Sequence, residues 1–339
     1  MSLLKRILDA IKRPEEAVPN WAPDSLRSKP VFNSPPRPIF IIGAPRSGTS
    51  VSTWALGQHP NIQPVPETGW IAIMAVAAEQ AYYVGSERGR FSHFSNVSYP
   101  PEPFLRRIGE AVHKSVCDVF EERCTRMYGD WRQLGVIRNK PNSPTPELLL
   151  RRHSNDPKKR WVDGTPLNSA YTWGLLRIFP EARFVHLVRR PHEVVASLAN
   201  FNEVGGVRHN FDEGIQNWID HTYQALLAQK ALGKQLVHVA KFEEIATDPR
   251  KFFGDILEFV DEPWCDDCLA PLNRKINSSN VESEREKVLE LVRNNPLYQK
   301  ADDIYRQVLE WTGEEIDDTA AQEVRDCTIF HARDRRLIG

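Results

Sequence analysis

Residues 40–56, FIIGAPRSGTSVSTWAL, match a phosphate-binding loop at all but one of its fixed positions. A nucleoside-triphosphate loop reads G-x-x-x-x-G-K-[ST], and Gly43, Gly48 and Ser50 stand at the corresponding places. Thr49 stands where the lysine is expected. The apolar run before the loop and the helical spacing after it form the strand–loop–helix context in which backbone N–H groups bind an anion. The sequence therefore predicts an anion site that works without the usual lysine.

The elements that would position this loop alternate between strands and helices. Short apolar runs predict buried parallel strands at residues 38–43, 160–166, 182–188 and 235–245. Helical spacing predicts helices at residues 48–59, 70–84, 104–128, 168–179, 191–201, 212–232 and 248–260. Residues 85–103 are expected to form a long loop. This alternation predicts an α/β fold in which helices cover both faces of a parallel sheet.

The domain organisation follows from composition shifts. Residues 1–13 are expected to form an amphipathic helix that either packs on its own domain or contacts a membrane surface or a partner. Prolines make the rest of residues 1–37 an extended strap, and residues 38–282 are expected to form the main domain, with a helical insertion at about 70–150. Residues 283–339 are expected to form a helical extension.

Composition limits the classes of partner and compartment. Lysine plus arginine (44) nearly equals aspartate plus glutamate (45), so a global charge field indicates neither nucleic-acid nor membrane binding. Five cysteines, few and odd in number, favour a reducing compartment, and we expect a cytoplasmic protein. No apolar run approaches the ~20 residues of a membrane-spanning helix. Cys265 and Cys268 form one C-x-x-C, but a zinc site needs two further ligands, so no metal site is predicted.

Two stretches together resemble the sulfotransferases that use 3′-phosphoadenosine 5′-phosphosulfate (PAPS). GAPRSGTS looks like their 5′-phosphosulfate loop, P-[RK]-S-G-T-[TS], and FVHLVRRPHEVVAS looks like their 3′-phosphate motif. The similarity covers residues 38 to about 279 and is greatest to the bacterial and tyrosylprotein-type branch. It implies a three-layer P-loop-type fold with a five-stranded parallel sheet flanked by helices. It also implies PAPS as the donor, no required metal, and donor contacts from Arg46, Ser47, Gly48, Thr49, Ser50, Arg189 and Ser197.

The branch implies two further residues. HPNIQPVPETGW resembles the segment in which the family places a catalytic glutamate, and Glu67 holds that position. KINSSN resembles a segment that closes over the nucleotide with a serine; Ser279 is the match, and Ser278 fits nearly as well. The chain departs from the family at Gly164, where many relatives carry a lysine, and at Val51, where the cytosolic enzymes stack adenine on a tryptophan.

The chemistry of sulfuryl transfer explains why a lysine can be absent. A sulfuryl group carries one negative charge less than a phosphoryl group, so N–H groups of residues 47–50, the helix N-terminus and Arg46 can hold it without metal. Arg46 can grip two oxygens at once, including the one on which charge grows as the S–O bond breaks. Glu67, sheltered near the loop, is expected to act as the general base for the acceptor hydroxyl.

Several residues also have structural interpretations that the sequence leaves open. Arg189 could pair with Glu193 in the next helix, and Ser197 could be a small packing residue. Glu67 could cap the helix that follows it, and Asp163 could either bind the acceptor or end its strand. His59 is interpreted as a structural turn residue. Loop 85–103 is expected to shape the acceptor pocket, with the aromatic residues Trp70, Tyr83, Phe91 and Phe94 either lining it or lying in the core.

The expected function is therefore sulfuryl transfer from PAPS to a hydroxyl of a sugar, a tyrosyl group or a small alcohol or phenol. A P-loop kinase of a small hydroxyl compound is the nearest enzymatic alternative. A non-catalytic nucleotide-binding protein is the alternative from another class.

Overall fold

The computed structural model describes residues 35–128, 136–137, 150–151, 158, 160–199, 209–273, 285–313 and 315–334. The chain divides into two compact units, Met1–Pro35 and Pro36–Gly339, and the fold described below belongs to the second. The predicted helix at residues 1–13, the predicted boundary at 282/283 and Ser279 lie outside the described residues. Among the helices that are described, none combines the length and apolar character needed to cross a membrane.

A five-stranded parallel sheet forms the centre of this unit. Its strands are β1 (Ile39–Ile42), β2 (Ile62–Val65), β5 (Arg160–Asp163), β6 (Arg183–Val188) and β7 (Val237–Lys241), in the order β2-β5-β1-β6-β7. All four neighbouring pairs are parallel. A separate antiparallel pair joins β3 (Val136–Ile137) to β4 (Leu150–Arg151). The predicted α/β fold class is confirmed.

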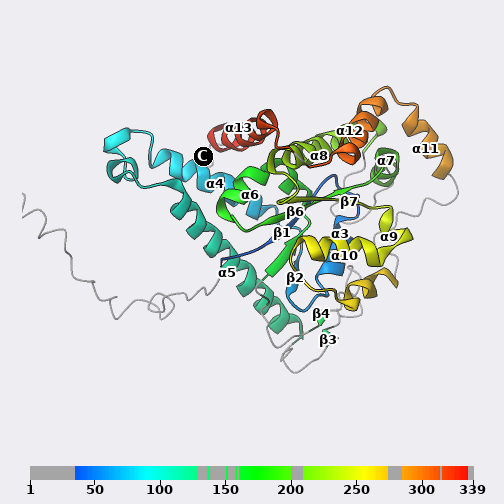
Figure 1. Cartoon of the computed structure of the whole chain (residues 1–339), viewed down its shortest axis with the longest axis horizontal. Coiled ribbons are helices and arrows are strands. Elements are labelled where there is room, and N and C mark those ends of the chain that lie inside the picture. Colours follow the sequence, from blue (N-terminus) through cyan, green and yellow to red (C-terminus); the bar gives the residue numbers. More distant parts are fainter. Residues whose placement is uncertain are drawn as a thin grey trace, which may run out of the picture. The chain divides into compact units, whose positions relative to one another are not determined.

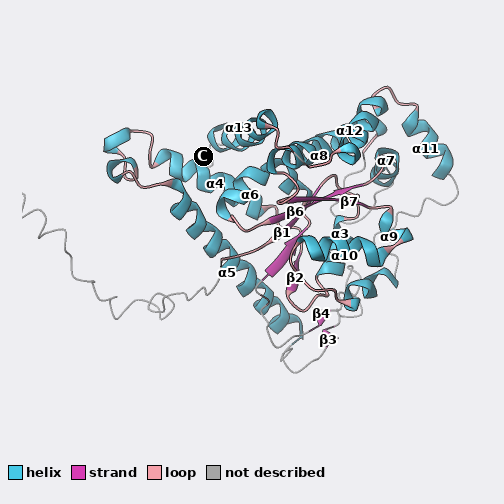
Figure 2. Ribbon diagram, viewed as in Figure 1, coloured by secondary structure: helices cyan, strands magenta, loops and turns pink. Residues whose placement is uncertain are grey.

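Helices cover both faces of the sheet (Figure 2). The helices of the described residues are α3 (Thr49–Leu56), α4 (Trp70–Val84), α5 (Pro101–Tyr128), α6 (Thr172–Ile178), α7 (Pro191–Ala199), α8 (Phe211–Leu232), α9 (Glu244–Thr247), α10 (Pro249–Phe259), α11 (Arg285–Arg293), α12 (Tyr298–Glu310) and α13 (Asp318–Asp334). Short 3₁₀ turns are η1 (Gly89–Phe91), η2 (Ser95–Val97), η4 (Pro166–Tyr171) and η5 (Asp266–Asn273).

The alternation of side chains along β1 explains the layers. Phe40 and Ile42 pack into a core with α4, α5, α6 and α8, whereas Ile39 and Ile41 pack into a second core with α3 and α10. Successive side chains of a strand point to opposite faces, so a strand buried on both faces has no polar position. This is why β1 is a continuous apolar run in the sequence.

Most local predictions agree with the structure, and the differences have simple causes. The predicted helix at residues 70–84 is α4 itself, and Asp248 opens α10 by accepting a hydrogen bond from the Lys251 N–H at 2.9 Å. Sequence patterns missed β2, which is short and contains Pro64. The proline is tolerated because β2 is an edge strand. Helix α5 begins at Pro101 rather than at residue 104, because proline suits a first helical turn.

Candidate functional site

The loop between β1 and α3 depends on glycine at two positions. Gly43 has φ 132°, and a Cβ there would lie 2.3 Å from the Leu187 carbonyl oxygen. Gly48 has φ 99°, and a Cβ there would lie 2.2 Å from the ring of Phe242. Both the backbone conformation and the close approach exclude larger residues. The Gly43 N–H donates to Ser169 Oγ at 2.9 Å, which ties the start of the loop to η4.

Arg46 connects the two motifs that the sequence singled out. Its Nε donates a hydrogen bond to Ser197 Oγ at 3.1 Å, and its backbone carbonyl accepts one from Arg189 Nη1 at 3.1 Å. Arg46 also has φ 66°, a left-handed conformation that costs a non-glycine residue about 1–3 kcal/mol. The structure therefore brings together three of the predicted donor-binding residues and holds one of them in a strained conformation.

Arg189 has the structural partner that the sequence suggested as an alternative, together with other contacts. Its Nη2 lies 3.3 Å from Glu193 Oε2 one helical turn on, and its guanidinium stacks 4.5 Å from the centroid of the Phe242 ring. The same side chain contacts the loop through Arg46 O. The pairing with Glu193 thus orients the guanidinium at the loop rather than away from it.

The cradle of the loop offers polar groups to an anion. Among the described residues, the buried Ser47 Oγ has no hydrogen-bond partner. The N-terminal N–H groups of a helix lack intrahelical partners, and α3 begins at Thr49 with no side-chain cap. The sequence prediction included the Ser47 N–H in the cradle, but this N–H donates to Ala44 O at 3.3 Å. The amides of the helix N-terminus, from Gly48 onward, remain suited to phosphosulfate oxygens.

Glu67 is held at the same edge of the sheet by a network of hydrogen bonds. The last residue of β2, Val65, pairs with Asp163 at the end of β5. Thr68 Oγ1 donates to Asp163 Oδ2 at 2.9 Å, and the Thr68 N–H donates to Thr165 Oγ1 at 2.9 Å. The Thr165 N–H and hydroxyl both donate to Asp163 Oδ1. This network anchors the segment that carries Glu67 beside the carboxyl ends of β2 and β5.

The electrostatics of Glu67 depend on two other residues of the site. Partial burial raises the pKa of Glu67 above its usual value of 4.5, the negative charge of Asp163 raises this pKa further, and the positive charge of Arg46 opposes both. The residue as a whole is exposed to solvent. A carboxylate with a raised pKa next to an anion site is the environment expected of a general base.

The structure contradicts the capping interpretation of Glu67. The N-cap of α4 is Gly69, no side chain caps this helix, and no acidic residue lies in its first turn. The structure also distinguishes between the two interpretations of Asp163. This residue is fully buried, and both of its carboxyl oxygens accept hydrogen bonds from threonines. Burial raises the pKa of Asp163, and the hydrogen bonds act in the opposite direction. Asp163 therefore anchors the site and is not placed to contact an acceptor.

His59 has the structural role that was predicted. It is buried, its Nδ1 accepts from the Asn61 N–H at 3.1 Å, and its Nε2 lies 2.9 Å from Pro263 O. Burial lowers the pKa of His59, which favours the neutral ring. Next to it, the buried Lys158 donates from Nζ to three carbonyl oxygens between the end of α3 and the start of β2, those of Gly57, His59 and Ile62. A positive charge at a helix C-terminus stabilises the helix dipole.

Gly164, where the resemblance led us to expect a lysine, has no room for a side chain. A Cβ at this position would lie 2.3 Å from Thr53 Oγ1 and 3.2 Å from Thr49 O, both in α3. The close packing of α3 on the end of β5 therefore excludes a lysine side chain at this position. Within the described residues, Thr53 Oγ1 has no hydrogen-bond partner, so the hydroxyl can be removed at little cost.

We predict that Gly164→Ala destabilises the protein and that Thr53→Ala restores much of the loss. Overpacking of this kind costs about 1–3 kcal/mol, and removing the Thr53 hydroxyl removes the contact responsible. Urea unfolding of the two single variants and the double variant gives the coupling free energy. Additive effects of the two substitutions would show that the steric account of Gly164 is wrong.

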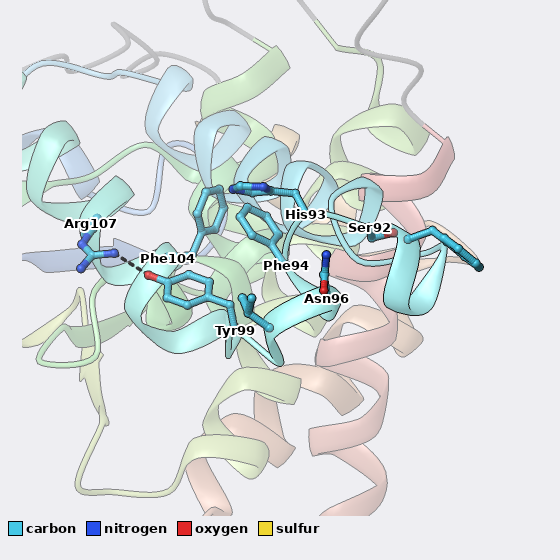
Figure 3. A pocket seen from close by; sticks show the side chains of 9 residues that line it. Ser92, His93, Phe94, Asn96, Tyr99, Phe104 and Arg107 are labelled. Atoms are coloured by element: carbon cyan, nitrogen blue, oxygen red, sulfur yellow. Dashed lines mark hydrogen bonds between the residues drawn. The ribbon is translucent and has the colours of Figure 1, made fainter. Parts of the chain in front are cut away.

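The loop after α4 lies apart from Glu67. A cavity of about 530 Å³ lies within it, lined by Phe91, Ser92, His93, Phe94, Asn96, Val97, Tyr99, Phe104 and Arg107 (Figure 3). The 15-residue α4 separates it from Glu67 by about 22 Å, and Figure 1 shows the loop at the end of α4 remote from α3. Residues 85–103 thus lie apart from Glu67, and their part in the acceptor pocket stays a prediction. The core interpretation fails for Trp70, Tyr83 and Phe91, which are exposed.

Sequence patterns missed several residues of the site. Thr68 and Thr165 hold the Glu67 segment through Asp163, and Phe242 packs against both Gly48 and Arg189. A partial signal existed for one of them, because an aspartate at a strand end followed two residues later by threonine favours a local side-chain turn. Phe242 follows a strand like many core residues, and nothing local distinguishes it.

Comparisons with known proteins find similarity to sulfotransferases. A sequence profile described as "Sulfotransferase family" matches residues 38–266. A protein-tyrosine sulfotransferase from Drosophila melanogaster is 23% identical over 67% of this chain and 38% of its own length. Protein-tyrosine sulfotransferase A from Caenorhabditis elegans is 23% identical over 84% of this chain and 66% of its own length. The chain thus spans less than two thirds of either relative.

A solved structure also shows similarity. The sulfotransferase domain from the Synechococcus PCC 7002 olefin synthase is 16% identical, covers 88% of this chain and 96% of its own, and superposes with a TM-score of 0.41.

Proposed function

Because the chain belongs to the sulfotransferase family, we propose that it transfers a sulfuryl group from PAPS to a hydroxyl of an acceptor. The observation that carries this proposal is the contact of Arg46 with both Ser197 and Arg189, which joins the phosphosulfate loop to the 3′-phosphate motif. PAPS would supply an activated sulfuryl group on a phosphate leaving group. The two motifs are the parts of the chain that would hold the two ends of its nucleotide.

The donor-binding residues fit such a ligand. The helix N-terminus at Thr49, the Ser47 hydroxyl and the Arg46 guanidinium offer donors to the 5′-phosphosulfate. Arg189 and Ser197 would bind the 3′-phosphate, which ATP lacks. We assign Ser279 to the closing segment on the family resemblance alone. The proposal requires no metal.

Glu67 is the proposed general base. Its raised pKa makes the carboxylate a stronger proton acceptor than an ordinary glutamate. It would accept the proton of the acceptor hydroxyl as the oxygen attacks sulfur in line with the departing phosphate oxygen. Arg46, whose charge acts on Glu67, would bind the oxygens on which negative charge grows. The acceptor is a sugar, a tyrosyl group or a small alcohol or phenol, since a glutamate base suits each of them.

The kinase alternative is less compatible with the site. A phosphoryl-transferring loop needs a lysine to neutralise the transferable end of a triphosphate, and Thr49 stands there. Arg189 and Ser197 would have no ligand in a kinase whose nucleotide lacks a 3′-phosphate. We also assign the protein to a reducing compartment such as the cytoplasm. The small and odd number of cysteines, five, supports this assignment.

We predict that adenosine 3′,5′-bisphosphate binds without Mg²⁺ and that Arg189→Ala weakens this binding by about tenfold to a hundredfold. The reason is the loss of one charge-assisted hydrogen bond, which is worth ~1.5–3 kcal/mol. Calorimetric titration with the bisphosphate, ADP and ATP measures both effects. The matched control is Arg106→Ala, which removes an exposed arginine on α5. Equal affinity for ADP and the bisphosphate would contradict the assignment.

Catalysis is tested directly with ³⁵S-labelled PAPS and a panel of sugar, tyrosyl-peptide and alcohol acceptors. Labelled product is the expected result. Bisphosphate binding with no labelled product from any acceptor class would instead support a non-catalytic nucleotide-binding protein.

A further inference from the structure

One face of α4 is apolar from end to end and open to solvent. Its side chains fall within about 100° of arc around the helix. They are Trp70, Ile73, Met74, Ala77, Ala81 and Val84. Trp70, Ile73 and Met74 are 36–40% exposed, and Val84 is 56% exposed. The one charged residue of α4, Glu79, lies off this face and pairs with Arg177 at 2.7 Å. A helix covered only by solvent normally carries charged groups on its outer face.

The loop after α4 carries two further exposed apolar side chains. Phe91 and Val97, at its two 3₁₀ turns, are each 73% exposed. These residues and the six on α4 are called the α4 face below. Exposed apolar side chains gathered on one helix and on the loop that follows it are a feature of interaction sites.

The loop is built to hold these side chains outward. The Phe94 ring stacks on Tyr82 with centroids 5.2 Å apart and packs on Phe104 at 5.1 Å. A Cβ at Gly85 would lie 2.5 Å from the Phe94 ring. Hydrogen bonds from Tyr82 Oη to Tyr99 O (2.6 Å) and from Ser95 Oγ to Ser86 O (2.8 Å) close the loop. Figure 3 shows Phe94 packed among neighbouring rings and Arg107 reaching Tyr99. The packing of Phe94 on Tyr82 and Phe104 thus supports the loop that carries the exposed Phe91 and Val97.

The charges beside the α4 face are mainly positive. Four exposed arginines lie in the loop and at the start of α5: Arg88, Arg90, Arg106 and Arg107. The acidic residues there are Glu87 and Glu102, and Glu102 pairs with Arg177 at 3.1 Å. The guanidinium of Arg90 stacks 4.9 Å from the centroid of the Phe91 ring, so an apolar body and a charged tip are presented together. Aromatic rings flanked by arginines suit the interface of an anionic bilayer.

We propose that the α4 face binds the surface of a membrane that contains anionic lipids. Phe91, Val97 and Val84 enter the boundary between headgroups and acyl chains, while Arg88, Arg90 and Arg107 contact lipid phosphates. His93 and Asn96, which line the cavity beside Arg107, offer further polar contacts to a headgroup. Helix α4 begins three residues after Glu67, so the candidate site lies at most about 11 Å of chain from this face.

The test is flotation of the full chain with vesicles of phosphatidylcholine alone and with about 30 mol % phosphatidylserine. We expect the protein to float with the anionic vesicles and to detach as salt shortens the Debye length below about 8 Å. Phe91→Ser with Val97→Ser should lower partitioning by about tenfold or more, because both exposed apolar groups are lost. Arg88→Glu with Arg90→Glu should lower it by at least about tenfold.

Matched substitutions elsewhere are the controls. Val119→Ser removes an equally apolar side chain that is 64% exposed but lies about 27 Å further along α5. Lys300→Glu reverses an exposed charge on α12. Both should float like the unaltered protein. Unchanged bisphosphate binding by every variant shows that each is folded.

Two results would overturn the proposal. One is absence of the unaltered protein from anionic vesicles, and the other is equal flotation of the Phe91→Ser, Val97→Ser variant, which would place lipid binding on other residues such as 1–13. A dimer that this variant dissociates, without lipid binding, would make the α4 face a contact between two copies. None of these results depends on sulfuryl transfer.

Discussion

Glu67→Gln should lower kcat by about 10²–10⁴-fold, the usual contribution of a general base. Glutamine keeps the shape of the side chain but cannot accept the proton of the attacking hydroxyl. Affinity for adenosine 3′,5′-bisphosphate should stay the same or rise slightly, because a negative charge near the anion site disappears. The melting temperature should not fall, since Glu67 does not cap α4. Steady-state kinetics, calorimetry and thermal unfolding on one preparation measure all three.

The matched control is Glu87→Gln, which alters an exposed glutamate in the loop after α4. It should leave kcat unchanged. Full activity of Glu67→Gln would remove this residue from the mechanism. Asp163 would not replace it as the base, because its buried oxygens are occupied by Thr68 and Thr165.

The pH dependence of the rate tests the same group in a second way. The base works in its ionised form, so the rate should rise with pH through the pKa of Glu67. Burial and the charge of Asp163 raise this pKa above 4.5, so the acidic limb should lie above that value. Asp163→Asn removes the like charge and should move the limb to lower pH. Persistence of the limb in Glu67→Gln would assign it to another group.

Arg46→Ala should lower kcat by about 10²–10³-fold, the range found when a donor to a developing oxyanion is removed. The effect should be larger on kcat than on the dissociation constant of the bisphosphate, because charge on the contacted oxygens grows only in the transition state. Arg189 should remain in place, since it contacts the backbone carbonyl of Arg46, which alanine keeps. Turnover at saturating donor and calorimetry of the product separate the two quantities.

Ser197→Ala provides a graded comparison. It removes the oxygen that accepts from Arg46 Nε but keeps the positive charge, so kcat should fall less than in Arg46→Ala. Near-normal turnover of Arg46→Ala with saturating donor would mean that Arg46 orders the loop without acting on the reaction. Arg46→Gly tests the contribution of the loop conformation. Glycine adopts a φ of 66° without strain, so this variant removes both the side chain and the backbone strain at position 46.

The elements of the fold could be read from the sequence where their signals are local. The apolar run of β1, the helical spacing of α4 and the proline at the start of α7 each depend on neighbours within a few residues. The spacing of the glycines at positions 43 and 48 likewise predicted the loop between β1 and α3. Strand β2 had no such signal, since its proline is tolerated only because tertiary structure places it at the sheet edge.

Motif spacing and the family resemblance also identified candidate site residues from the sequence by itself: Arg46, Glu67, Arg189 and Ser197. Only tertiary structure decided how they meet. The contact between Arg46 and Ser197 joins residues 151 positions apart, and the bond from Thr68 to Asp163 spans 95. The close approach of Thr53 to Gly164 and the exposure of the apolar face of α4 were equally inaccessible. Periodicity records which side of a helix is apolar, but what covers that side depends on how distant segments pack against it.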